Sequence, residues 1–204
     1  MKKIMFNERF GLEQAVLAGT KTMTRRIIKG NFEDVKAYHA NGGWHFIADT
    51  DEGDSVELKP QYEIGERVAI AQPYKNDDVL TYNAYNEDGT AREDGLQRHK
   101  EMLDSKGYRN KMFVKAEYMP HRIRITGIKV ERLQDISDED CLKEGVEKWI
   151  DCYIVSGIME NQGKNNVCFD SPREAFAALI DRISGRGTWQ CNTWVYVYTF
   201  ELIK

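Results

Sequence analysis

The chain has 204 residues, of which 41% are hydrophobic and 30% are charged, and it carries a net charge of -4. At roughly 150 residues per domain, this length favours one domain with insertions over two. The mean hydropathy of -0.61 and the lack of any run near the ~18 apolar residues of a membrane span argue against a membrane protein. Charged residues at Glu8 and Arg9 come too early for a signal peptide, so we expect a cytoplasmic protein.

The four cysteines and four histidines show no spacing typical of a metal site. No C-x-x-C pair occurs, and no histidine pair lies near a cysteine. The sequence therefore predicts reduced thiols, no metal and no cofactor.

The N-terminal third predicts a strand, a helix and then a turning loop. Residues 1–6 are typical of a short strand, and Asn7 can cap a helix with an apolar face. Gly19 predicts the left-handed end of that helix. Residues 21–26 are therefore expected on a loop.

The middle of the chain predicts a core strand between two irregular regions. Alternating pieces at 44–47 and 56–58 favour hairpin strands, and residues 66–71 predict a core strand. Residues 76–105 are polar and contain a turn at 86–90, which leaves a mobile flap and a disordered insertion as alternatives.

The C-terminal half predicts two capped helices between long strands. Residues 121–131 alternate strictly, with a phase change at Gly127 that indicates a bulge or a strand break. Ser137 and Ser171 predict helix N-caps, the second followed by Pro172. Residues 194–203 predict a strand in the middle of the sheet. Together these patterns indicate an α+β fold with a mixed or barrel-like sheet.

Charge is unevenly distributed along the chain. Residues 109–132 contain seven basic and two acidic residues and are therefore net +5 in a chain that is net -4. Such a stretch favours a local anion-binding surface, although a solvated strand face explains it equally well.

The segment from Gly19 to Arg26 is the main candidate site. Neighbouring Arg25 and Arg26 lower the pKa of a lysine, so a neutral Lys21 amine could take a proton from Thr24, and the arginines could hold a phosphate. In the structural alternative, the cations complement the helix dipole and Thr24 bonds the backbone.

This segment resembles the G-x-K-x-x-T-x-R signature of ASCH domains, in particular the phage-associated branch. Gly19, Lys21, Thr24 and Arg26 supply the motif. Further similarity lies at residues 64–68, 118–120, 122–126, 130–137, 187–189 and 192–197. Residues 30–60 and 75–105 are not covered, and we interpret them as insertions in a single domain that spans residues 1–204.

The resemblance implies a PUA-like mixed β-barrel with flanking helices and a cleft that binds RNA or nucleotides. It also implies a second possible function, because some members are amidohydrolases that act on N4-acetylcytidine through the motif lysine and threonine and a strand glutamate. In this chain the first two are Lys21 and Thr24.

The chain departs from the family where carboxylates are expected. Arg124 and Gln72 stand at the positions of two family glutamates. An arginine there favours anion binding over hydrolysis. Glu117 or Glu66 could substitute from a neighbouring strand.

The sequence therefore predicts a protein that binds RNA or a modified nucleotide or nucleoside, with neither a metal nor a membrane as partner. The expected ligand-binding residues are Gly19, Lys21, Thr24, Arg25, Arg26, Arg122 and Arg124. The alternatives are a nucleoside amidohydrolase with Lys21 as base and Thr24 as nucleophile, and a phage-encoded protein-interaction module. Aromatic residues such as Trp44 could stack on a base or pack in the core.

Overall fold

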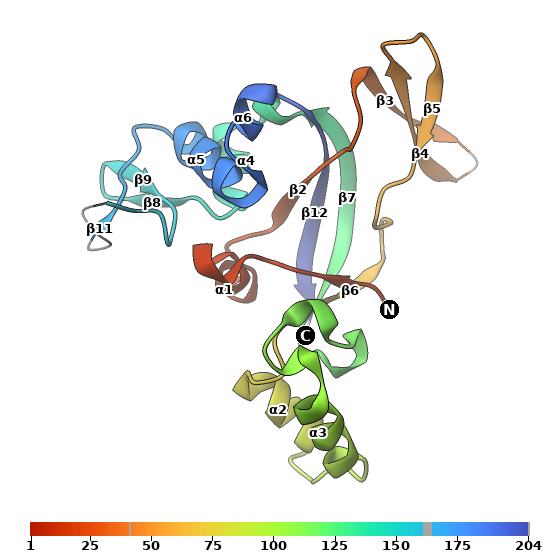
Figure 1. The fold of residues 1–204 in the computed structure, drawn as a ribbon, viewed down its shortest axis with the longest axis vertical. Coiled ribbons are helices and arrows are strands. Elements are labelled where there is room, and N and C mark those ends of the chain that lie inside the picture. Colours follow the sequence, from red (N-terminus) through yellow and green to blue (C-terminus); the bar gives the residue numbers. More distant parts are fainter. Residues whose placement is uncertain (41, 161–164, 204) are drawn as a thin grey trace. The chain divides into compact units, whose positions relative to one another are not determined.

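The computed structural model describes residues 1–40, 42–160 and 165–203, which form an α+β fold (Figure 1). These residues divide into two compact units. The first, unit 1, comprises residues 1–6, 66–124 and the end of the last strand, and the second, unit 2, comprises residues 7–65 and 125–201. Each unit is assembled from segments that are distant in the sequence, so the division does not correspond to two consecutive domains. The single domain expected over residues 1–204 stays a prediction.

Unit 1 contains two short strands, the start of a long strand and two α-helices. Strand β1 (Lys3–Ile4) pairs in parallel with β6 (Arg67–Ile70), and β6 pairs antiparallel with the first residues of β7 (Arg122–Arg132). Helices α2 (Asp77–Ala84) and α3 (Gly95–Asp104) lie within residues 76–105, for which the sequence left a mobile flap and a disordered insertion as alternatives. The predicted turn at 86–90 joins them and is confirmed by the bond from the Gly89 amide to the Asn86 carbonyl.

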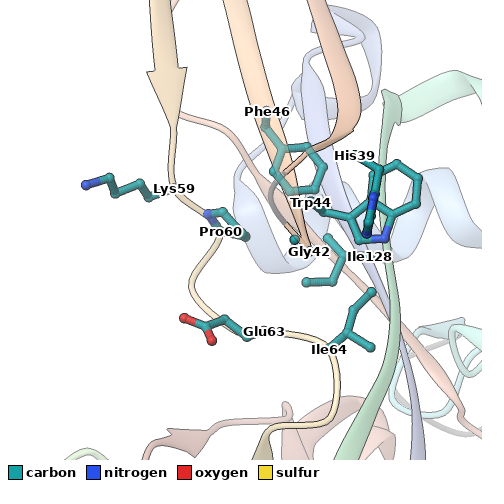
Figure 2. Close-up of a pocket in the computed structure, with 10 residues that line it drawn as sticks. His39, Gly42, Trp44, Phe46, Lys59, Pro60, Glu63, Ile64 and Ile128 are labelled. Atoms are coloured by element: carbon teal, nitrogen blue, oxygen red, sulfur yellow. The ribbon is translucent and has the colours of Figure 1, made fainter.

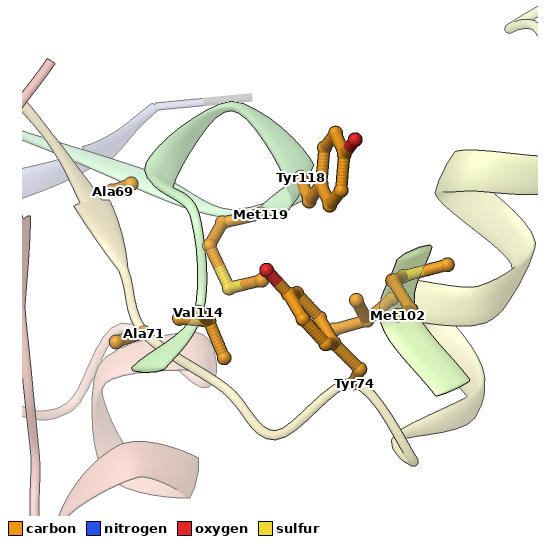
Figure 3. Packing of buried hydrophobic residues seen from close by; sticks show 8 residues of the cluster. Ala69, Ala71, Tyr74, Met102, Val114, Tyr118 and Met119 are labelled. Carbon is orange, nitrogen blue, oxygen red and sulfur yellow. The ribbon is translucent and has the colours of Figure 1, made fainter. Parts of the chain in front are cut away.

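The core of unit 1 explains why this polar segment is ordered. Tyr74, Met102 and Met119 are almost fully buried and pack with Tyr118, Ala69 and Ala71 (Figure 3). At the edge of this cluster, Glu101 accepts hydrogen bonds from Lys115 and Tyr118, and the Lys115 bond lowers the pKa of Glu101 to about 2. A few buried side chains per helix therefore stabilise a segment whose surface is polar.

Unit 2 is built on a sheet in which β12 (Trp194–Ile203) lies between β7 and β2 (Met23–Ile27), as Figure 1 shows. The central position predicted for β12 is confirmed. A second, antiparallel sheet contains β3 (Phe32–Ala40), β4 (Gly43–Thr50) and β5 (Ser55–Leu58), within the first predicted insertion.

Helices and short hairpins complete unit 2. They are α1 (Leu12–Leu17), α4 (Asp138–Lys143), β8 (Glu147–Trp149), β9 (Cys152–Ile154), β10 (Met159–Glu160), β11 (Asn165–Asn166), α5 (Pro172–Ser184) and α6 (Thr188–Cys191). The predicted caps are confirmed, because Ser137 and Ser171 accept from backbone amides at the starts of α4 and α5. None of the helices in the described part of the chain is long and apolar enough to cross a membrane.

Two expectations from the sequence are wrong, and one of two alternatives is excluded. No sheet among the described residues closes into a barrel, because the strands of the insertion pair with one another as a separate sheet. Strand β7 continues without a break through Gly127, so of the two predicted irregularities only a bulge remains as a prediction. Cys152 and Cys168 form a disulfide rather than two thiols, because β9 and the chain after β11 bring their Cα atoms to 5.6 Å.

Candidate functional site

The motif segment begins at a turn, as predicted, but continues as a strand. Gly19 has a φ of +77°, which confirms the left-handed end of α1. Residues from Met23 onwards form β2 rather than a loop, with Thr24 opposite Tyr198, Arg25 opposite Val197 and Arg26 opposite Tyr196 on β12. The expectation of a turning loop through Arg26 is therefore wrong, because β12 supplies a complete pairing partner.

Strand geometry separates the motif residues onto two faces of the sheet. Successive side chains of a strand point to opposite faces, so Thr24 and Arg26 share one face and Arg25 lies on the other. The Arg25 guanidinium lies over the ring of Phe176 from α5, at 5.9 Å. The spacing of these residues predicts one cluster of side chains, whereas β2 distributes them between two environments.

Lys21 is buried and fully engaged. Its ammonium donates to the Met23 carbonyl, the Glu144 carbonyl and the Glu144 carboxylate, each at 2.7 Å. Burial lowers the pKa of Lys21 from its ordinary value, while the Glu144 carboxylate opposes this shift. Three acceptors use all three donors of an ammonium group.

Arg25 completes a buried ionic network around the same carboxylate, which we call the Lys21–Arg25 network. Its guanidinium contacts Glu144 at 3.0 Å, Glu131 at 2.6 Å and Asp140 at 3.3 Å. Three carboxylates around one guanidinium leave it little capacity to bind a phosphate, because its charge is already compensated.

Glu144 is the functional candidate that the sequence reasoning missed. It directly follows α4, which the sequence indicated only as a capped helix, and it lies 123 residues from Lys21. The proposed substitutes, Glu66 and Glu117, both belong to unit 1, and Glu66 accepts a hydrogen bond from Lys2. No local pattern marks Glu144, because its role depends on a contact distant in the sequence.

Three arginines lie on one face of the β6–β7 pair in unit 1. Arg67 and Arg124 are direct cross-strand partners, and Arg122 lies two residues from Arg124. Val68 and Ile123, the intervening pair, are fully buried on the opposite face. Arg122 donates to the Tyr82 hydroxyl of α2 at 3.1 Å. We call these three residues the arginine face.

Unit 2 also contains a pocket of about 640 Å³, within the size range of small-molecule sites. It is lined by His39, Gly42, Gly43, Trp44, Phe46, Lys59, Pro60, Glu63, Ile64 and Ile128 (Figure 2). The ring of Phe46 packs edge-on against Tyr196, the cross-strand partner of Arg26. The pocket wall is therefore in contact with the sheet face that carries Thr24 and Arg26.

Comparisons of the chain with models of protein families, with curated proteins and with solved structures find no match. The ASCH resemblance therefore stays a prediction. Within the residues that the structure describes, no three His, Cys, Asp or Glu side chains gather as a set of metal ligands.

Proposed function

We propose that the chain is an ASCH-like protein that binds RNA or a nucleotide, with the arginine face as its phosphate contact. The observation that supports this proposal is the cross-strand pair Arg67 and Arg124. Two guanidinium groups on neighbouring strands can hold one phosphate through charge-assisted hydrogen bonds. Arg122 extends the same face, and Tyr82 holds its side chain.

The charge distribution of the chain agrees with this proposal. Arg122 and Arg124 belong to the stretch that is net +5, whereas the whole chain is net -4. An acidic remainder limits indiscriminate binding to nucleic acid, so binding is confined to the local basic surface. Arg67 lies outside that stretch, and only the pairing of β6 with β7 adds it to the surface.

The arginine face is tested with a labelled single-stranded RNA and fluorescence anisotropy at several salt concentrations. Each phosphate contact contributes about 0.7 to the slope of log affinity against log salt. The double variant Arg67→Ala/Arg124→Ala is expected to bind about tenfold more weakly at low salt and to reduce the slope by about 1.4.

A matched control is Lys148→Ala, which removes one charge from an exposed position on β8. This variant should bind RNA as the parent protein does. A flat salt response of the parent, or equal losses in the control and the double variant, would overturn the proposal.

A second candidate function, amidohydrolysis of N4-acylated cytidine, is favoured by the carboxylate that contacts Lys21. In this reaction a neutral Lys21 amine takes the Thr24 proton and the Thr24 oxygen attacks the amide carbonyl. The cytidine amine then leaves with that proton, and water hydrolyses the acyl-Thr24 ester to release the carboxylic acid. Lys21 must first exchange one of its three acceptors for the Thr24 hydroxyl.

The hydrolase candidate predicts that the protein releases cytidine from N4-acetylcytidine, detected by chromatography. Thr24→Ala should abolish release, and Thr24→Ser should retain part of it because a hydroxyl remains. Release that continues unchanged in Thr24→Ala, or no release from the parent protein, rules out this mechanism.

A further inference from the structure

The pocket in unit 2 is formed mainly by residues that the ASCH resemblance does not cover. His39, Trp44 and Phe46 belong to β3 and β4 of the inserted sheet, and Pro60 follows β5. Ile128 of β7 closes one side. The insertion therefore adds a concave site to this chain, beyond the motif at Gly19 to Arg26.

The interior of the pocket is aromatic and aliphatic. Phe46 is fully buried, whereas Trp44 and Ile64 are 48% and 47% exposed although both are large apolar residues. Figure 2 shows Trp44, Ile64 and Ile128 gathered opposite Pro60. Exposed apolar side chains that face one another across a concave surface indicate a ligand with an apolar body.

The indole of Trp44 is held in place by its cross-strand partner. His39 pairs with Trp44 in the β3–β4 register, and their rings meet edge to face at 5.6 Å and 82°. This contact restrains the indole while almost half of its surface stays open. A restrained, open aromatic face is the arrangement on which planar rings stack at little cost in side-chain entropy.

The rim of the pocket carries charges of both signs. Lys59 and Glu63 line the pocket, and their charged groups point away from the apolar residues in Figure 2. An acyl chain has no polar groups that could bind to either charged side chain. A nucleobase matches both, because its edge carries hydrogen-bond donors as well as acceptors.

We infer that this pocket binds an unstacked nucleobase, which lies against Trp44 with its polar edge towards the rim that carries Lys59 and Glu63. The base belongs either to a free nucleoside or to single-stranded RNA. This inference rests on the proposed function, because it supplies base recognition to a protein proposed to contact phosphates through the arginine face. Within the proposed function, Trp44 is a binding residue and not a catalytic one.

The test measures binding to Trp44 variants with three probes. Free adenosine, guanosine, cytidine and uridine are titrated by calorimetry, and a short labelled RNA and its abasic counterpart are titrated by anisotropy. Trp44→Ala should weaken binding of nucleosides and of the normal RNA by about tenfold or more, and Trp44→Phe should restore most of the affinity.

Trp149→Ala is the matched control, because Trp149 is also an exposed tryptophan of unit 2, at 58%, but lies on β8 outside the pocket lining. It should leave all affinities unchanged. If the normal RNA binds, free nucleosides do not bind, and Trp44→Ala lowers the RNA affinity, the inference is supported and the base belongs to RNA. If Trp44→Ala lowers the affinity for both free nucleosides and the normal RNA, the pocket accepts a base from either source.

Two results would overturn the inference. One is an abasic RNA that binds as tightly as the normal RNA while free nucleosides do not bind, which leaves the arginine face intact as a phosphate contact. The other is equal affinity in Trp44→Ala and Trp149→Ala. Conversely, nucleosides that bind through Trp44 while no RNA binds would refute the RNA contact and retain the base pocket, so the two proposals fail separately.

Discussion

Replacing Glu144 by Ala is expected to lower the free energy of unfolding by about 3–5 kcal/mol, the cost of breaking a buried ion pair by removing one partner. Lys21 and Arg25 both contact this carboxylate and are almost completely buried. Without it, the ammonium of Lys21 loses the charged one of the three acceptors named above, and the other two are the backbone carbonyls of Met23 and residue 144. A buried cation without a compensating charge destabilises the folded state.

This loss is measured by urea denaturation followed by tryptophan fluorescence. All four tryptophans lie in unit 2, as does Glu144, so the signal reports the unit that contains the Lys21–Arg25 network. Glu139→Ala is the control, because Glu139 is exposed and lies on α4, the helix that Glu144 directly follows. It should change the free energy of unfolding by less than about 0.5 kcal/mol. A similar small change in Glu144→Ala would contradict the role assigned to the network.

Replacing Gly157 by Ala is expected to cost about 3 kcal/mol, from backbone strain and a steric clash together. Gly157 has a φ of +78°, where a side chain is disfavoured. A Cβ atom at this position would also collide with the carbonyl oxygen of Arg9, which belongs to the backbone and cannot rotate away. The segment around Gly157 or the turn at Arg9 must therefore move.

Gly19→Ala separates the two causes, because Gly19 has nearly the same φ, +77°, and no atom lies within 4 Å of its added Cβ. It should cost about 1 kcal/mol, the strain alone. Both glycines lie in unit 2, so the same fluorescence measurement applies. Equal losses in the two variants would show that the contact with Arg9 does not limit the packing.

The candidate site combines features that the local sequence predicts with features that depend on strand pairing. The motif residues were found from their spacing, and the turn at Gly19 was predicted from the conformational freedom of glycine. The sequence does not predict that these residues lie on two faces of a sheet. Residues 21–26 are compatible with both a loop and a strand, and only the pairing with β12 decides between the two. The motif predicts Lys21 as a base next to Thr24, whereas its ammonium donates hydrogen bonds to Met23 and to both the carbonyl and the carboxylate of Glu144.

The two predicted insertions contain structure that their local sequence does not predict. Polar composition made residues 76–105 compatible with disorder, yet a few side chains such as Met102 order α2 and α3 by burial in the core of unit 1. Similarly, the hairpin strands at 44–47 and 56–58 were predicted, but the pocket that they form with Ile128 requires the return of a distant strand.

The sequence by itself determined the features that depend on a few neighbouring residues. These are the caps at Ser137 and Ser171, the turn at Gly19, the α+β class and the long apolar strand that became β12. Only the tertiary structure decided which charges meet. Glu144 reaches Lys21 across 123 residues, and Arg67 meets Arg124 across two strands. Hydrogen bonds of caps and turns are local, whereas ion pairs and pockets depend on which buried faces pack together.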